Sequence, residues 1–267
     1  MEPCGKSTGK SDSPFDCLLF DLDDTLYSSK AGINGVCKSN IEEFLVKKCG
    51  YSAEKASYLR VELFRTYGST LAGLRALGFN IDADEYHSFV HGSLPYEALK
   101  SNERLRKVLR SITQRKLVFT NSDRNHTRRV LERLGLDDCF DDIICFETLN
   151  PNISKSTRPD EFPVILKPSI DAMKIAIEVA GEDPCRTMFF DDNDQNIAAG
   201  KTVGFRTVLV GKAVKSKEAD YALENVVDSA QVIPEIWMGG EHKGEDGVIM
   251  RARSEMGSAL AALPVGA

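Results

Sequence analysis

Five short apolar runs constrain the fold of this chain more than any other feature. They cover residues 16–21, 116–120, 142–147, 187–191 and 206–210, and each is continuous rather than alternating between apolar and polar side chains. Continuous runs of this length are typical of parallel strands that are buried on both faces. Between the later runs lie helical patterns at 124–134, which ends at Gly135, and at 169–180, which follows Pro168. This alternation predicts a doubly wound α/β core with a parallel sheet.

A long segment between the first two runs carries helical patterns instead of strands. Apolar side chains recur at helical spacing around residues 41–48, 58–64 and 71–77. Because connections this long rarely lack structure, we expect residues 28–100 to form an inserted helical cap. The insert starts at the end of the first strand, where α/β sheets bind ligands, so we expect it to act as a lid.

The remaining boundaries follow from this division. Residues 14–27 and 101–238 are expected to form the core, in two segments that flank the insert. Residues 1–13 and 239–267 show no sustained hydrophobic pattern, and we expect both to be flexible tails.

Composition excludes several classes of partner. The chain has 267 residues, a net charge of −6 and no long run of Lys and Arg, which argues against nucleic-acid polymers and anionic membranes. No apolar stretch approaches the length needed to span a membrane, and the first residues lack the apolar core of a signal peptide. Seven cysteines, an odd number without a CxxC pair, indicate small buried thiols in a reducing compartment. We therefore expect a cytosolic protein, whose oligomeric state the sequence leaves open.

Two acidic clusters end apolar runs. Residues 18–27 read LLFDLDDTLY, which places Asp21, Asp23 and Asp24 within four positions, and residues 191–194 read DDND. Turn chemistry alone explains one such cluster, since Asp is a common turn residue. Two clusters at the ends of parallel strands meet at the same edge of the sheet, where like charges raise one another's pKa. The pair therefore predicts a site for a hard divalent cation such as Mg²⁺.

Other strand ends supply groups that bind phosphate. Thr120 and Asn121 follow the second run and offer a hydroxyl and an amide, although a turn or helix cap would explain them equally well. Lys167 precedes Pro168 and follows three apolar residues. Most lysines face solvent, but this setting favours an ammonium group directed toward the acidic clusters or a phosphate.

Together these motifs resemble those of a known family. The stretch Asp21-Leu22-Asp23-Asp24-Thr25, Thr120 after an apolar run, Lys167-Pro168, and Asp191-Asp192 with Asn196 are similar, in chain order, to the four motifs of the haloacid dehalogenase-like (HAD) hydrolases. The resemblance covers residues from about 16 to 210. It implies a Rossmann-like core and, because the insert lies between the first and second motifs, a helical cap.

The resemblance also implies catalytic roles. Asp21 would be the nucleophile that forms an aspartyl-phosphate, and Asp23 would be the general acid and base. Thr120 and Lys167 would hold the phosphoryl oxygens, and the amide of Asn121 is a further candidate for phosphate binding. The expected reaction is the hydrolysis of a phosphoric monoester, because relatives that cleave carbon–halogen bonds lack an acid at the position of Asp23.

The same resemblance implies a Mg²⁺ site. Its ligands would be the carboxylates of Asp21 and Asp192 and the backbone carbonyl of Asp23. Asp191 would either bind the ion through water or support the ligands. We assign no catalytic role to Asp24.

A finer resemblance concerns the substrate. The stretches FDLDDTLY, TYGSTLAGLRALG, DEYHSFVHGSLPY and FTNSDRNH are similar to the pyrimidine 5′-nucleotidase-like branch, and among its plant members to xanthosine 5′-monophosphate (XMP) phosphatases of purine catabolism. This implies a nucleoside 5′-monophosphate as the small-molecule partner, with XMP ahead of UMP and CMP. A sugar-phosphate phosphatase and a catalytically silent binding protein remain open alternatives.

Candidate substrate contacts lie mostly in the insert. They are Tyr67, Ser69, Thr70, His91 and, after the second motif, Arg124. Tyr67 and His91 are equally consistent with half-buried structural residues, and Arg124 with a solvated helix face.

Overall fold

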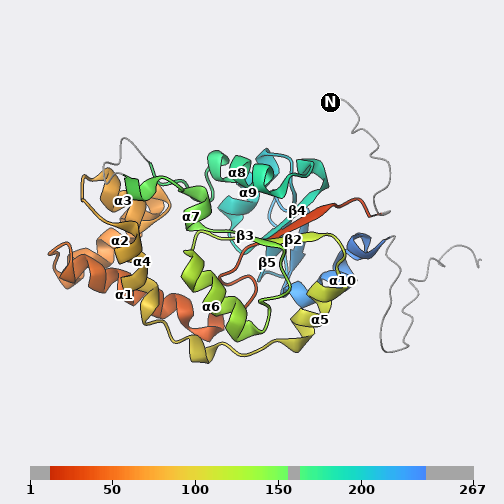
Figure 1. Cartoon of the computed structure of the whole chain (residues 1–267), viewed down its shortest axis with the longest axis horizontal. Helices are drawn as coiled ribbons and strands as arrows, with labels where there is room; N and C mark the ends of the chain where they lie inside the picture. Colours follow the sequence, from red (N-terminus) through yellow and green to blue (C-terminus); the bar gives the residue numbers. More distant parts are fainter. Residues whose placement is uncertain (1–12, 156–162, 239–267) are drawn as a thin grey trace, which may run out of the picture.

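A computed structural model describes residues 13–155 and 163–238 of the chain, and its centre is a six-stranded sheet (Figure 1). The strands are β1 (Cys17–Phe20), β2 (Arg115–Phe119), β3 (Asp142–Ile144), β4 (Thr187–Asp191), β5 (Arg206–Val210) and β6 (Tyr221–Leu223). They pair in parallel in the order β3-β2-β1-β4-β5-β6. The α/β fold class is thereby confirmed. The ends of β1, β2 and β4, where the sequence motifs lie, are neighbours in the sheet.

Helices surround this sheet and fill the long interval between β1 and β2. The α-helices are α1 (Ile33–Lys47), α2 (Ala53–Tyr67), α3 (Thr70–Ala76), α4 (Ala83–Gly92), α5 (Glu103–Ser111), α6 (Arg124–Leu134), α7 (Phe146–Leu149), α8 (Ile170–Ala180), α9 (Asp194–Thr202) and α10 (Ser229–Val232). The 3₁₀ turns are η1 (Ser29–Ala31), η2 (Tyr96–Ala98), η3 (Ile153–Lys155), η4 (Pro184–Arg186), η5 (Val226–Asp228) and η6 (Pro234–Trp237). None of the helices in the described ranges is long and apolar enough to cross a membrane.

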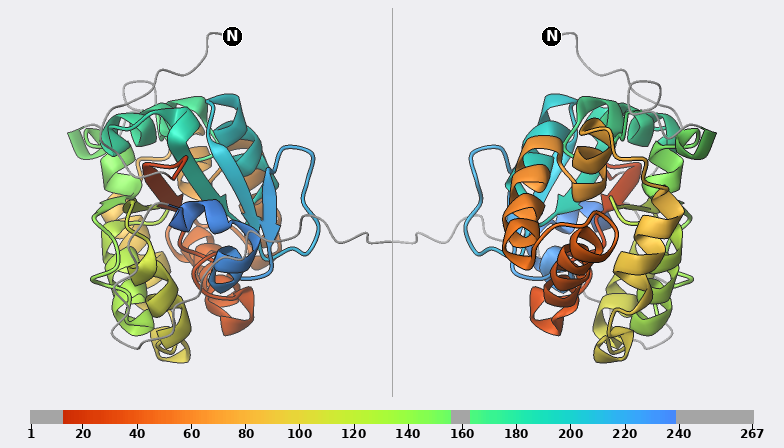
Figure 2. Two further views of the ribbon diagram at one scale, coloured as in Figure 1. Left: turned by 90° about the vertical axis from the view of Figure 1, so that its right-hand side faces the viewer. Right: turned by 90° about the vertical axis from the view of Figure 1, so that its left-hand side faces the viewer.

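The two faces of the sheet are covered by different helices (Figure 2). Leu18 and Phe20 of β1 point toward α5 and α6, while Leu19 between them packs with residues of α8 and α9. All three side chains are fully buried. Burial on both faces explains why the strands are continuous apolar runs rather than alternating ones.

Local capping chemistry sets the ends of the predicted helices. Asp123 accepts hydrogen bonds at 3.0 Å from the backbone N–H groups of Asn125 and His126 at the start of α6, and Gly135 ends that helix with φ 68°. Ser169, rather than Pro168, caps the start of α8, because its hydroxyl accepts a bond from the N–H of Ala172. Side-chain oxygens at these positions satisfy N–H groups that lack partners inside the helix.

One strand prediction needs correction, and one strand was missed. The run at 142–147 is a strand only to Ile144, because a capping box formed by Cys145 and Thr148 starts the short helix α7 at Phe146. Strand β6 was not predicted, since its three residues at the sheet edge are too short to show a period.

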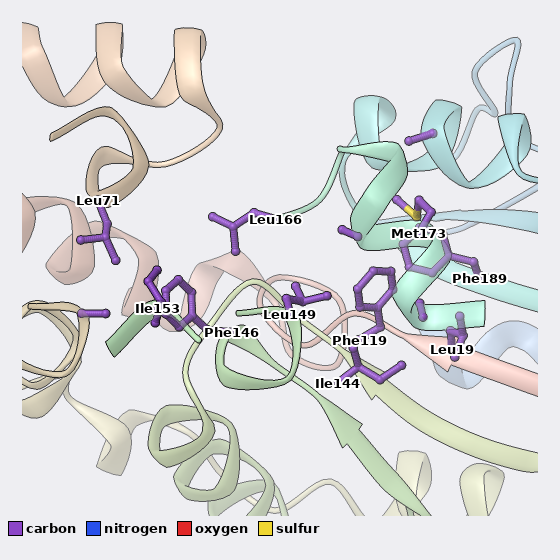
Figure 3. Packing of buried hydrophobic residues seen from close by; sticks show 14 of the residues in the cluster. Leu19, Leu71, Phe119, Ile144, Phe146, Leu149, Ile153, Leu166, Met173 and Phe189 are labelled. Carbon is purple, nitrogen blue, oxygen red and sulfur yellow. The ribbon is translucent and has the colours of Figure 1, made fainter. Parts of the chain in front are cut away.

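Helices α1–α4, here called the helical insert, lie together at one end of the molecule (Figure 1). A continuous apolar cluster joins them to the sheet (Figure 3). Along it, Leu71 of α3 lies beside Ile153 and Phe146, and Leu149 lies between this pair and Phe119 of the sheet. The insert is thus packed against the core through α7 and η3. The domain boundaries at residues 28 and 100 stay a prediction.

The predicted tails fall almost entirely outside the described residues. Ser13, at the edge of the first tail, is buried, and its hydroxyl donates a hydrogen bond to the carbonyl of Glu235 at 3.0 Å. The six cysteines in the described ranges are free thiols, and of these Cys185 is exposed.

Candidate active site

Asp21 lies directly after the central strand, and both of its carboxylate oxygens are held. Oδ2 accepts a hydrogen bond from the hydroxyl of Thr25 at 2.8 Å, and Oδ1 accepts one from Nζ of Lys167 at 2.8 Å. The backbone N–H donates to the carbonyl of Phe190 in the next strand at 2.8 Å. Asp21 is thus buried and fixed at the carboxyl edge of the sheet.

Lys167 reaches this carboxylate from a loop between the third and fourth strands. Its Nζ donates three hydrogen bonds, to Asp21 at 2.8 Å, to Asp191 at 2.7 Å and to the carbonyl of Phe119 at 2.7 Å. These bonds use all three ammonium hydrogens. Burial lowers the pKa of Lys167, but the two carboxylates more than offset this effect and raise it to about 12. The lysine is therefore a buried cation and not part of a solvated surface.

Thr120 and Asn121 occupy the end of β2 beside this lysine. The side-chain amide of Asn121 accepts from the N–H of Lys167 at 2.8 Å and donates to its carbonyl at 2.9 Å, so it fixes the lysine segment. Thr120 is buried, and its hydroxyl oxygen accepts from the N–H of Ser122 at 3.0 Å. Since that contact uses the oxygen, the hydroxyl hydrogen can be donated to a phosphoryl oxygen.

Three carboxylates meet where the acidic clusters converge. One oxygen each from Asp21, Asp191 and Asp192 lies within 4.8 Å of the other two. Burial raises the pKa of Asp192 to about 7, and the charges of Asp191 and Asp24 add to this effect. Burial also raises the pKa of Asp21, although Lys167 opposes it. One ammonium group does not neutralise three carboxylates, and oxygen ligands in this number suit Mg²⁺.

Asp191 and Asp192 differ in how they are engaged. Asp191 is fully buried, and in addition to Lys167 it accepts hydrogen bonds from the N–H of Asn193 at 2.9 Å and from the amide of Asn196 at 2.9 Å. Both carboxylate oxygens of Asp191 therefore already accept hydrogen bonds from the protein. Asp192 is only partly buried, which favours it as the ligand that this strand end presents to a cation.

Asp24 orders the turn that follows the first strand. Its backbone has φ 63°, a left-handed conformation that Asp tolerates better than most residues. Its carboxylate accepts a hydrogen bond at 2.9 Å from the amide of Asn34 in α1. Asp24 therefore joins the motif loop to the helical insert.

Asp23 is surrounded by three hydrogen-bond donors that the sequence did not identify. Oδ1 accepts from the hydroxyl of Tyr27 at 2.5 Å and lies 2.8 Å from Nε2 of His126, while Oδ2 accepts from the hydroxyl of Ser122 at 2.7 Å. Burial raises the pKa of Asp23, but the charge and hydrogen bond of His126 outweigh it, so the net shift is downward. A lone histidine on the buried face of an amphipathic helix, next to the second motif, is the signal that would have found His126.

The five candidate substrate residues fall into two groups, of which the first lies between α2 and α3. Ser69 caps α3, and Thr70 is buried and hydrogen-bonded to Tyr86. Tyr67, at the end of α2, is 41% exposed. The next residue, Gly68, approaches the catalytic loop: a Cβ atom at this position would lie 3.9 Å from the carbonyl oxygen of Lys167. The segment that contains Tyr67, Ser69 and Thr70 therefore adjoins the lysine.

The other two candidates lie on the α6 side of the site. His91 of the insert contacts Asp123 of the core, with 2.5 Å between Nδ1 and Oδ2. The guanidinium of Arg124 donates to the hydroxyl of Thr148 in α7 at 3.2 Å. His91 thus links the insert to the core, and Arg124 links α6 to α7.

Comparison with known proteins identifies the family. Residues 15–204 match the family model described as "Hydrolase: haloacid dehalogenase-like hydrolase". The chain belongs to this family. The HAD resemblance predicted from the motifs is thereby confirmed at the level of the superfamily.

Two curated relatives share part of their length with this HAD hydrolase. Phosphate metabolism protein 8 of Saccharomyces cerevisiae is 27% identical over 219 residues, which cover 79% of this chain and 64% of the yeast protein. Pyrophosphatase PpaX of Halalkalibacterium halodurans is 23% identical over 122 residues, which cover 43% of this chain and 50% of that protein. The chain thus spans less than two thirds of the length of each relative.

Solved structures show the same fold at low identity. A HAD phosphatase from Thermococcus onnurineus is 17% identical with a TM-score of 0.51, covering 81% of this chain and 97% of that one. The HAD hydrolase YfnB of Bacillus subtilis, in a structure bound to magnesium, is 18% identical with a TM-score of 0.51 and the same coverage.

Proposed function

We propose that this HAD hydrolase is a Mg²⁺-dependent phosphatase of nucleoside 5′-monophosphates, with XMP as the favoured substrate. One observation gives the main support for phosphatase activity. Nζ of Lys167 lies 2.8 Å from Asp21 and 2.7 Å from Asp191, within the carboxylate group that can hold a cation. Phosphoryl transfer requires positioning and charge neutralisation more than any other contribution, and these groups provide both.

In the first step, an oxygen of Asp21 attacks the phosphorus of the monoester. The bond between phosphorus and the 5′-oxygen breaks, and Asp23 gives a proton to that oxygen. Because His126 lowers the pKa of Asp23, Asp23 must take up this proton as the ester binds, when the negative charge of the phosphate opposes the effect of His126. The nucleoside leaves, and the phosphoryl group remains on Asp21. Hydrogen bonds from Thr25 and Lys167 fix the attacking carboxylate, which favours a single direction of approach.

In the second step, Asp23 acts as a base. Its carboxylate takes a proton from water, the water oxygen attacks phosphorus, and the bond to Asp21 breaks. Phosphate is released, Asp21 is again a carboxylate and Asp23 again carries a proton. Division of one difficult displacement into two is the benefit of a covalent intermediate.

The surrounding residues hold the phosphoryl group. The hydroxyl of Thr120 would donate to one of its oxygens, and Lys167 would reach another by exchanging its bond to Oδ1 of Asp21 for one to the phosphoryl group. Mg²⁺, when bound, neutralises charge on these oxygens. Asp21, Asp192 and the carbonyl of Asp23 would hold it, while Asp191 keeps Lys167 in place.

The choice of nucleotide is the finer part of the proposal. It is supported by the sequence resemblance to the nucleotidase branch and by the place of Gly68, which brings residues 67–70 of the insert next to Lys167. There Tyr67 and Ser69 are the candidates for contact with the ribose or base, whereas Thr70 is buried. His91 and Arg124 are candidates on the other side. UMP, CMP and sugar phosphates are the alternatives. A small molecule, not a polymer or a membrane, is the proposed partner.

A panel of phosphate esters tests this proposal. We expect Mg²⁺-dependent phosphate release that EDTA abolishes, with kcat/KM highest for XMP among the common nucleoside monophosphates, hexose phosphates and inorganic pyrophosphate. Asp21→Asn should be inactive, while Asp171→Asn, which changes an exposed carboxylate on α8, should retain full activity. A hexose phosphate or UMP that exceeds XMP would refute the substrate, and full activity of Asp21→Asn would refute the nucleophile.

A further inference from the structure

A chain of hydrogen bonds connects the carboxylate of Asp23 to the segment that leads back from the helical insert. Nε2 of His126 lies 2.8 Å from Oδ1 of Asp23, and Nδ1 on the opposite side of the ring lies 2.9 Å from the hydroxyl of Tyr96. Tyr96 belongs to η2, between α4 and α5, and its hydroxyl also donates to the carbonyl of His91 at 3.0 Å. Both ring nitrogens of His126 therefore have a polar partner.

The imidazole of His126 is held firmly. The residue is 2% exposed, and its backbone N–H is fixed by Asp123 at the start of α6. The ring of His91 lies 4.6 Å from it, centroid to centroid. The guanidinium carbon of Arg129 lies 3.9 Å from the centroid of the Tyr96 ring. A side chain packed in this way has few rotamers left, so its Nε2 points to one place.

We propose that His126 is a positioning residue whose Nε2, aligned by Tyr96, fixes the carboxylate of Asp23 in the orientation that proton transfer requires. The inference rests on the proposed function, in which Asp23 is the acid and base. Asp23 needs such a partner because its side chain is 34% exposed, unlike the buried carboxylate of Asp21, and lies directly before the left-handed residue Asp24. Efficient proton transfer demands a heavy-atom distance of about 2.6–3.2 Å, so even a small displacement of this carboxylate would slow both steps.

The other two donors act differently from His126. Tyr27 comes from the same loop as Asp23, four residues later, and moves with it. Ser122 has a short side chain that binds the opposite oxygen. His126 is the donor that belongs to a long helix of the core, so it ties the orientation of Asp23 to a rigid element.

Two amide substitutions separate positioning from mere packing. In His126→Gln the amide nitrogen extends about as far as Nε2 and can still donate to Asp23. In His126→Asn the amide nitrogen extends only about as far as Nδ1, so it can form a hydrogen bond with Tyr96 but cannot reach Asp23. With a nucleoside monophosphate we expect kcat of the Asn variant to fall about 10- to 100-fold with KM within about twofold, and kcat of the Gln variant to stay within about fivefold of wild type.

A substrate with a better leaving group locates the defect. p-Nitrophenolate departs without being protonated, so the first turnover of p-nitrophenyl phosphate should remain fast in His126→Asn and appear as a burst, while the later turnovers are slow. Equal losses of kcat in the Gln and Asn variants would overturn the proposal. So would an unchanged kcat in the Asn variant, or a first turnover slowed as much as the later ones.

An NMR measurement tests the contact without turnover. The chain has four histidines, which keeps the imidazole spectrum simple. In the metal-free protein, Asp23→Asn should shift the ring ¹⁵N and ¹H resonances of His126 and leave those of His87 nearly unchanged. Unchanged His126 resonances would refute the contact. A wild-type protein that hydrolyses no phosphate monoester would instead refute the proposed function, so the two failures are distinguishable.

Discussion

Replacement of Lys167 by methionine removes the buried cation of the site at nearly constant volume. The substitution deletes hydrogen bonds to Asp21, Asp191 and the carbonyl of Phe119. It leaves two carboxylates in a region where Asp191 is fully buried and Asp21 nearly so. Because these charges lose their partner but not their burial, we expect a large decrease in the free energy of unfolding.

The magnitude follows from two estimates. The pKa of Lys167, raised from 10.5 to about 12, corresponds to about 2 kcal/mol of favourable interaction with the ammonium group. This contribution is fully present below pH 10.5 and is lost as the pH rises through 12, so all of it acts at pH 7. Removal of one partner from a buried ion pair costs more, about 3–5 kcal/mol, because it also leaves the opposite charges unpaired. We expect Lys167→Met to lower the free energy of unfolding by the larger of these two amounts, about 3–5 kcal/mol.

Thermal and urea unfolding in EDTA at pH 7 measure this loss. A cost of about 3–5 kcal/mol should lower Tm by about 6–20 °C. The loss should shrink toward pH 5, where the unpaired carboxylates can take up protons, and on addition of Mg²⁺. Lys174→Met is the matched control, since Lys174 is exposed and lies 3.5 Å from Asp171, and it should change stability by less than about 0.5 kcal/mol. If Lys167→Met unfolds within about 2 °C of wild type, the buried ion pair does not exist as described.

Three further predictions concern catalysis, pH dependence and packing. Asp23→Asn should lower kcat for a nucleotide by about 10²–10⁴-fold in a Mg²⁺-saturated assay, and a smaller loss than tenfold would contradict its role as acid and base. Burial lowers the pKa of His87 to about 4, so its contribution to stability is present above pH 6.5 and is lost as the pH falls toward 4. Between pH 7 and pH 4.5, the free energy of unfolding in urea should therefore fall by about 2–3 kcal/mol less in His87→Phe than in wild type. An equal fall in both proteins would argue against a buried neutral imidazole at His87. Gly73→Ala would place Cβ 2.7 Å from a methyl carbon of Leu63 and should lower the free energy of unfolding by about 1–3 kcal/mol. Gly35→Ala, whose Cβ would have nothing within 4 Å, should raise the free energy of unfolding by about 0.5–1 kcal/mol. If Gly73→Ala had the higher Tm of the two, the packing of α2 on α3 would be refuted.

The sequence predicted the features that depend on local pattern. Burial on both faces makes each main strand a continuous apolar run, and a residue that follows such a run must lie at the carboxyl edge of the sheet. Asp21, Thr120 and Asp191 could be placed at the site for this reason alone. The end of α6 at Gly135 was predicted equally well, because it depends on one residue in a left-handed conformation.

Features that depend on contacts between distant segments were missed. The hydrogen bonds of Tyr27, Ser122 and His126 to Asp23 join three separate segments, and no spacing in the chain encodes them. Likewise, apolar spacing identified α2 as a helix but not the side that is covered. Tyr58 is 64% exposed, whereas Leu63 on the same helix is buried. Which face of a helix is buried depends on its neighbours.

The covalent step at Asp21 is the centre of this account, and chemical trapping tests it most directly. The protein is mixed with substrate and Mg²⁺, quenched in acid during turnover and treated with borohydride, which reduces an acyl phosphate to an alcohol. Peptide mass spectrometry should then find homoserine in place of Asp21, and none when substrate is omitted. Homoserine at another acidic residue, or intact Asp21 in a protein that is turning over, would contradict the proposed mechanism.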